Sequence, residues 1–133
     1  MTINSASIPV DATITPSAGT ATTLKTKSND GALHVVFLDD GADLLTQSVM
    51  EFSYKEPKAQ SGAPNGYSQA RNTVVIKKPL ALDNGNRTVN TLRIEFAGDV
   101  EMTAAEKLSL RTLGVLALSD SDFTEFWDDQ SAA

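Results

Sequence analysis

Few residues in this chain could carry covalent or metal chemistry. The 133 residues include no cysteine and a single histidine, His34, so a cysteine nucleophile, a thiolate zinc site and a multi-histidine site are excluded. His34 lies in a β-rich run without a Ser/Asp constellation, and we interpret it as a structural or surface residue. The pairs Asp39–Asp40 and Asp128–Asp129 lack the oxygen-ligand spacing of a calcium loop. We therefore expect no enzyme, no cofactor, no metal site and no small-molecule substrate.

Basic side chains offer another chemistry, the binding of phosphate groups. In segments that alternate between polar and apolar residues, several Lys and Arg fall on odd-numbered positions, which predicts one shared face of a sheet. That face would carry six bases and two acids: Lys25, Lys27, Lys55, Arg71, Lys77 and Arg93 against Glu51 and Glu95. Neutralisation of phosphates by Lys and Arg drives nucleic-acid binding. The pattern favours an RNA-binding face, with the alternative that any solvated sheet face is polar.

Charge is divided unevenly along the chain. The net charge is −6, yet residues 1–98 contain nine acids and nine bases, and residues 99–133 contain eight acids and two bases. An acidic overall composition is therefore compatible with a basic binding face. No apolar run approaches the ~20 residues of a membrane span, and the N-terminus lacks the basic and apolar regions of a secretory signal. We expect no membrane partner.

The first 98 residues have the pattern of strands and turns. Met50, Phe52 and Tyr54 alternate with polar residues, and Thr88–Phe96 alternates strictly, which is typical of antiparallel strands with one buried face. No long helical segment interrupts them, so parallel crossovers are not expected. The pattern predicts an antiparallel meander of about six strands.

Turn residues divide this meander. Residues 12–15 and 20–27 flank the turn-rich quartet Pro16–Gly19, which predicts an N-terminal hairpin. Residues 57–66 are rich in Pro, Gly and Ser and are expected to form a loop. Pro79 should close the strand that contains Thr73–Ile76, because proline disrupts strand pairing.

The period of the pattern changes after Asp99. Thr103 and Glu106 have the spacing of a capping box, followed by a helix of roughly 16 residues. Phe123, Phe126 and Trp127 then form an aromatic face at i, i+3 and i+4, which predicts a short second helix.

The first of these helices is apolar on two sides. Leu108 and Leu116 share one sector, whereas Leu110 and Leu113 lean toward another. One sheet cannot cover both sides, so we infer that a second chain covers the other, with Leu110, Leu113 and Trp127 between subunits. The alternative is a core helix of a monomer, since buried helices are commonly apolar all round.

Four stretches of the sequence form a combination seen in one family. They are Phe52–Pro57 (FSYKEP), Ala70–Pro79 (ARNTVVIKKP), Thr88–Phe96 (TVNTLRIEF) and Asp122–Trp127 (DFTEFW). In order and spacing they resemble the coat proteins of levivirus-like single-stranded RNA bacteriophages. The resemblance covers about residues 8–128 and includes the chain length, the missing cysteines and the order of strands before helices.

The resemblance implies an α+β fold in a single coat protein domain over residues 1–133. Its parts are an N-terminal β-hairpin in residues 1–30, an antiparallel meander sheet in residues 31–98, and two C-terminal helices with a tail in residues 99–133. It also implies an interlocked dimer. The residues expected at the dimer interface are Leu110, Leu113, Leu116, Phe126 and Trp127.

The resemblance further implies a structural capsid protein that dimerises and assembles into an icosahedral T=3 shell around single-stranded genomic RNA. Such a protein belongs to the virion and is assembled in the cytoplasm of the bacterial host. In the family the inner sheet face binds RNA, including an operator hairpin that represses translation. Matched positions and the shared face together give the expected RNA-binding residues: Ser53, Lys55, Arg71, Thr73, Lys77, Thr91 and Arg93. The alternative is a small dimeric β-sheet module, RNA-binding or adhesin-like, that does not assemble.

Overall fold

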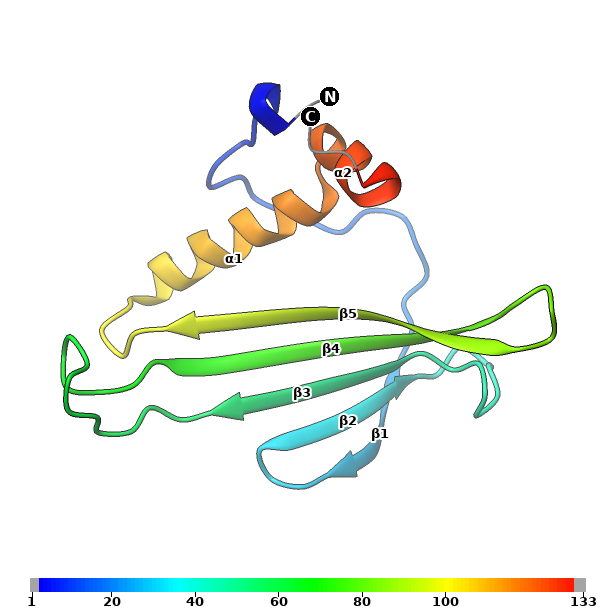
Figure 1. Cartoon of the computed structure of the whole chain (residues 1–133), viewed down its shortest axis with the longest axis horizontal. Helices are drawn as coiled ribbons and strands as arrows, with labels where there is room; N and C mark the ends of the chain where they lie inside the picture. The colour runs from blue at the N-terminus through cyan, green and yellow to red at the C-terminus, as the bar shows by residue number, and fades with distance from the viewer. Residues whose placement is uncertain (1–2, 131–133) are drawn as a thin grey trace. The chain divides into compact units, whose positions relative to one another are not determined.

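The computed structural model describes residues 3–130, which form one antiparallel sheet and a set of helices (Figure 1). The chain divides into two compact units. One unit, Gly19–Val100, contains the whole sheet, and the other combines the chain before Gly19 with the chain after Val100. The predicted α+β class and the order of strands before helices are confirmed.

Within residues 3–130 the sheet has five strands: β1 (Leu24–Asn29), β2 (Leu33–Leu38), β3 (Val49–Lys55), β4 (Ala70–Ala81) and β5 (Arg87–Gly98). Their spatial order equals their sequence order. Every neighbouring pair is antiparallel. The predicted antiparallel meander is therefore confirmed, with five strands in place of the expected six or so.

The N-terminal hairpin is formed by residues other than those we predicted. It joins β1 to β2, whereas residues 12–15 form no strand, so their predicted pairing with residues 20–27 is wrong. A competing contact explains the difference. Asp11 accepts a hydrogen bond from the Ser109 hydroxyl, and the residues that follow Asp11 line a groove along the first long helix.

Pro79 does not end a strand, contrary to our prediction. β4 continues to Ala81, and Pro79 lies opposite Val89 of β5. The β3–β4 ladder ends at the pair Val49–Lys77, so in the described chain β4 pairs beyond that point with β5 alone. Proline is tolerated at a strand edge because its missing N–H removes no ladder bond there. The strand therefore continues past the proline to Ala81.

The second unit is helical. Its elements within residues 3–130 are the 3-10 helices η1 (Ile3–Ser5) and η2 (Ser121–Phe123) and the α-helices α1 (Ala104–Ser119) and α2 (Thr124–Asp129). α1 begins with the predicted capping box: the Thr103 hydroxyl accepts from the Glu106 N–H at 3.2 Å, and the Glu106 carboxylate accepts from the Thr103 N–H at 3.4 Å. None of these helices is long and apolar enough to cross a membrane.

The aromatic residues of α2 fasten it to α1. The Trp127 indole N–H donates a hydrogen bond to the Ala117 carbonyl oxygen over 2.8 Å. The rings of Phe126 and Trp127 meet edge to face with their centroids 5.0 Å apart, a favoured aromatic geometry. The short helix is thereby held at the end of the long one.

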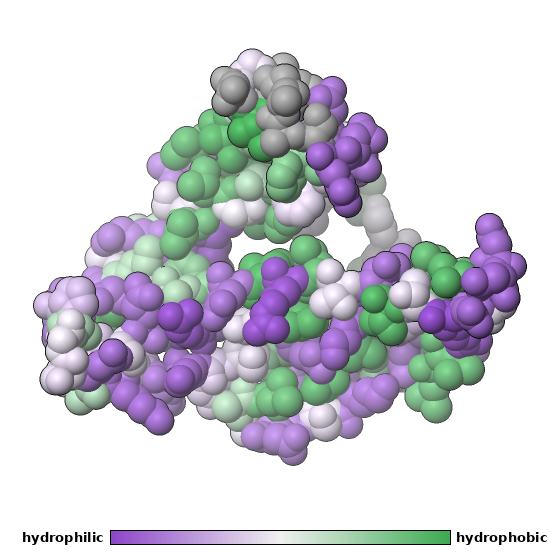
Figure 2. All heavy atoms as spheres, viewed as in Figure 1, coloured by the Kyte–Doolittle hydropathy of each residue, from purple (hydrophilic) through white to green (hydrophobic). Residues whose placement is uncertain are grey.

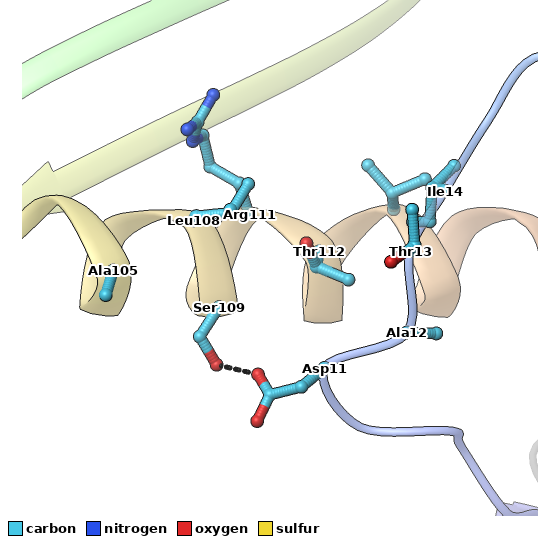
Figure 3. A pocket seen from close by; sticks show the side chains of 10 residues that line it. Asp11, Ala12, Thr13, Ile14, Ala105, Leu108, Ser109, Arg111 and Thr112 are labelled. Carbon is cyan, nitrogen blue, oxygen red and sulfur yellow. Dashed lines mark hydrogen bonds between the residues drawn. The ribbon is translucent and has the colours of Figure 1, made fainter.

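The N-terminal segment runs antiparallel to α1 within the same unit. The Ser7 N–H donates to the Asp122 carboxylate at 3.0 Å, beyond the C-terminal end of α1. The Ser109 hydroxyl donates to the Asp11 carboxylate at 2.5 Å, in the first half of α1 (Figure 3). These two contacts fix the direction of the segment.

Each unit has a small buried core. Among residues 3–130 the buried apolar side chains are Val36 of β2, 7% exposed, and Leu116 of α1, 9% exposed. Hydrophobic residues instead reach the surface around α1, where they are green in Figure 2. Such exposed apolar surface is typical of a protein that packs against a partner.

Candidate nucleic-acid interface

The seven residues predicted to bind RNA lie on one face of the sheet. The register places odd-numbered positions of β3, β4 and β5 opposite one another, and side chains directly opposite in a ladder point to the same side. The pairs are Lys55–Arg71, Ser53–Thr73, Lys77–Thr91 and Val75–Arg93. We call this side the basic face and define it by Ser53, Lys55, Arg71, Thr73, Lys77, Thr91 and Arg93.

Positive charge extends along the whole basic face. Lys55 and Arg71 lie opposite each other toward one end of the β3–β4 ladder, and Lys77 lies at its other end. Arg93 occupies an intermediate position on β5. Arg71 and Lys77 are six positions apart on one strand, about 20 Å at the rise of an extended chain. The face is therefore long enough to contact several nucleotides.

Ion pairs engage some of these cations. Arg71 lies 3.1 Å from the Glu95 carboxylate, and Lys77 lies 3.3 Å from that of Glu51. All four side chains keep more than a quarter of their surface exposed, and exposed pairs contribute only about 0–1 kcal/mol. Arg71 and Lys77 could therefore leave these carboxylates and bind RNA phosphates instead at little cost in free energy. Lys55 and Arg93 make no ion pair within residues 3–130.

β1 lies at the edge of the sheet beside β2 and carries two further cations. Lys25 lies opposite Phe37 and shares the side of the basic face, where it pairs with Asp39 at 2.9 Å. Lys27 falls where the ladder register shifts and has no partner on β2, and Ser28 takes the next position, opposite Val35. A bulge at this point interrupts the regular alternation of β1 after Lys25.

The opposite side of the sheet is largely apolar. Phe52, Leu92 and Ile94 lie on it and are 37%, 38% and 41% exposed. His34 also lies there, with its Nε2 atom 3.1 Å from the Thr26 hydroxyl. Within residues 3–130, no group of three or more His, Cys, Asp or Glu side chains could hold a metal ion. This side offers packing surface.

A pocket that the sequence did not reveal lies at the Lys55–Arg71 end of the basic face. A loop was predicted over residues 57–66, and Ala59 within it pairs with Tyr67 just beyond it to form a small hairpin. The hairpin and the two cations line an open pocket of about 510 Å³. The turn signal Asn65–Gly66 was the only local indication of this hairpin.

A second pocket lies within the helical unit (Figure 3). It also measures about 510 Å³ and runs between the segment Asp11–Ile14 and α1. Leu108 and Val115 contribute apolar walls, and Arg111 points away from Asp11. The groove therefore offers apolar contact area.

The residues predicted for the dimer interface differ in exposure. Leu110 and Leu113 of α1 are 44% and 40% exposed, and Phe126 and Trp127 of α2 are 41% and 46% exposed. Leu116 is 9% exposed and belongs to the core of the helical unit. Four of the five side chains thus have surface for a partner to cover.

One carboxylate outside the basic face has a shifted pKa. The Thr46 hydroxyl and the Leu45 N–H both donate to the Asp43 carboxylate at 2.9 Å. These bonds, the Thr46 hydroxyl first, hold the pKa of Asp43 below its usual value, and Arg87 adds electrostatic attraction. The ionised carboxylate therefore stabilises the turn before β3.

Comparison with known proteins identifies the fold. No family model and no curated protein sequence matches the chain. Among solved structures it is similar to the virus-like particle of bacteriophage GQ-907, with a TM-score of 0.88 and 25% identity over 99% of this chain and 100% of that chain. The particle of bacteriophage AVE019 gives a TM-score of 0.64 at 14% identity, covering 84% of this chain and 86% of that chain. The particle of bacteriophage ESE058 gives 0.61 at 13% identity, covering 87% and 99%. The chain has the fold of these phage particle subunits, and the predicted resemblance to a phage coat protein is confirmed.

Proposed function

We propose that this protein is a structural capsid protein whose basic face binds single-stranded RNA. The observation that carries the proposal is the likeness to the bacteriophage GQ-907 virus-like particle over essentially the full length of both chains. We accordingly assign the chain a structural role without catalysis.

The basic face supports RNA as the packaged partner. It joins five hydroxyl or basic positions of β3 and β4 with two of β5 in continuous register. Phosphate contacts by Lys and Arg bind RNA regardless of sequence, and Ser and Thr hydroxyls add contacts to sugars and bases. An operator hairpin that represses translation would bind to the same residues.

The exposed apolar residues support an interlocked dimer as the building block. Leu110, Leu113, Phe126 and Trp127 would meet the apolar side of a partner's sheet, while Leu116 holds α1 in its own unit. Because few apolar side chains are buried in one chain, folding and dimerisation should be coupled by mass action. Such dimers would then close into an icosahedral T=3 shell, in a virion assembled in the bacterial cytoplasm.

Electron microscopy of the protein expressed alone tests this function. We expect closed particles of uniform diameter. A protein that remains a dimer of about 28 kDa, twice the 14.1 kDa chain, across salt and concentration would instead be a non-assembling RNA-binding or adhesin-like module.

A further inference from the structure

The pocket at the Lys55–Arg71 end of the basic face has the composition of a nucleotide site. Its volume of about 510 Å³ lies within the ~300–1,000 Å³ typical of small-ligand sites. The lining combines two cations, two amides, one aromatic ring and one proline: Lys55, Arg71, Gln60, Gln69, Tyr67 and Pro64.

Hydrogen bonds hold the wall of this pocket in place. The Gln60 N–H donates to the Gly66 carbonyl oxygen at 2.8 Å, and the Ser68 N–H donates to that of Lys58 at 2.8 Å. The Asn65 side-chain amide donates to the Asp99 carboxylate at 2.8 Å and ties the hairpin to the end of β5. A wall fixed before binding loses little conformational entropy when a ligand enters.

The electrostatics of the pocket favour an anion. Lys55 and Arg71 lie directly opposite each other, and like charges in that arrangement destabilise a sheet. Glu95 offsets the charge of Arg71, whereas Lys55 makes no ion pair within residues 3–130. A phosphate bound between the two cations would relieve their repulsion.

Tyr67 provides a stacking surface beside these cations. It is 50% exposed although its backbone is fixed, because it pairs with Ala59 and its N–H donates to the Asn65 side-chain oxygen at 3.1 Å. Unpaired RNA bases stack on such aromatic rings. The amides of Gln60 and Gln69 can each donate and accept hydrogen bonds along a base edge.

We propose that this pocket binds one unstacked nucleotide of single-stranded RNA, with its base on Tyr67 and its phosphate between Lys55 and Arg71. The proposal rests on the proposed function, since it specifies how the basic face holds its RNA. It adds a base-stacking contact to a surface otherwise made of ionic and hydroxyl contacts.

Filter binding of a 20-nucleotide single-stranded RNA of mixed sequence to the full-length protein tests the base contact. Tyr67→Ala should weaken binding by about five- to 150-fold, the effect of losing one stacked base. The slope of affinity against salt should not change, because no cation is removed. Tyr67→Phe keeps the ring and should bind like the unaltered protein. Equal weakening by both variants would overturn stacking on Tyr67.

Photo-crosslinking of the unaltered protein to the same RNA containing 4-thiouridine provides a second test that needs no folded variant. Trypsin cleavage after Lys58 and Arg71 releases the peptide 59–71, which contains Tyr67. We expect RNA adducts on this peptide. Tight, salt-dependent binding with no adduct there would refute the pocket and leave the basic face intact. Failure to bind RNA at all would refute the proposed RNA partner.

Discussion

Arg93 of β5 lies directly opposite Val75 of β4, and Val75 in turn lies opposite Glu51 of β3. Arg93, Val75 and Glu51 therefore form a row across three strands in the middle of the basic face. Glu51 is engaged by Lys77 at 3.3 Å, whereas Arg93 makes no ion pair within residues 3–130. The Arg93 guanidinium is available to a phosphate, but its neighbour on β4 offers no polar contact.

A basic residue in place of Val75 should strengthen RNA binding. Val75→Lys would add one phosphate contact beside Arg93 and steepen the dependence of log affinity on log salt by about 0.7, the increment for single-stranded nucleic acid. Val75→Thr, which adds a hydroxyl and no charge, should leave the slope unchanged. Filter binding over a salt series measures both. An unchanged slope for Val75→Lys would mean that RNA does not pass this row.

Removal of the basic residues should reduce packaging. We expect the combined change of Lys55, Arg71 and Arg93 to Ala to lower the RNA content of purified particles and to flatten the salt slope by about two, since each lost contact contributes about 0.7. The RNA content is measured as the ratio of the particles' absorbance at about 260 and 280 nm, and the slope is measured from RNA affinity over a salt series.

A matched triple variant controls for net charge. Lys78 lies on the other side of β4, opposite Asn90, and Lys107 and Arg111 belong to α1. Their combined change to Ala removes the same three charges and should preserve RNA content and slope. If both triple variants behave alike, net charge rather than the basic face governs RNA uptake.

A charge placed on α1 should abolish assembly. Leu113 is 40% exposed in one chain and is proposed to be covered in the dimer. Truncating a buried Leu to Ala costs about 2–5 kcal/mol, and burial of an unpaired carboxylate is costlier still, so Leu113→Asp should yield no soluble assembly. Sedimentation at several concentrations measures this. Asp128→Ala, outside the proposed interface, should sediment like the unaltered protein.

A stable, well-folded monomer of Leu113→Asp would contradict the interlocked dimer. In that case the exposed side of α1 would not form the contact between subunits, which would have to lie elsewhere.

The turn at Asp43 should depend on pH. The hydrogen bonds to its carboxylate lower the folded pKa, so the stabilisation is fully present above the unfolded value of about 3.9 and is lost as pH falls through the folded pKa. Thr46→Ala removes the largest contribution and should raise the pKa of Asp43. An NMR titration of the Asp43 carboxyl carbon measures the shift. An unchanged midpoint would show that the Thr46 hydroxyl does not bind the carboxylate in solution.

Sequence patterns predicted correctly those strands and helices whose structure depends mainly on their own residues. Thr88–Phe96 alternates strictly and lies within β5, and the Thr103–Glu106 capping box starts α1. Which residues share the basic face was also predictable. Alternation within each strand determines which side chains lie on the same side once the strands pair in register.

The errors arose where a distant segment decides the outcome. Residues 12–15 have strand-like residues, but the first three of them line a groove along α1. The alternation of β1 is interrupted at Lys27, where its register against β2 shifts. Pro79 stays within β4 because β3 has already ended beside it. The Tyr67 pocket escaped prediction because the hairpin that forms it depends on contacts such as Asn65–Asp99, 34 positions apart.

The most direct test of the central claim is sedimentation of the full-length protein, expressed alone and treated with ribonuclease, with absorbance followed at about 260 and 280 nm. A capsid protein that packages RNA should sediment as particles of megadalton size that keep their nucleic-acid absorbance, because the shell protects the RNA. Sedimentation as a dimer of about 28 kDa, twice the 14.1 kDa chain, without nucleic acid at every salt and protein concentration would contradict the account.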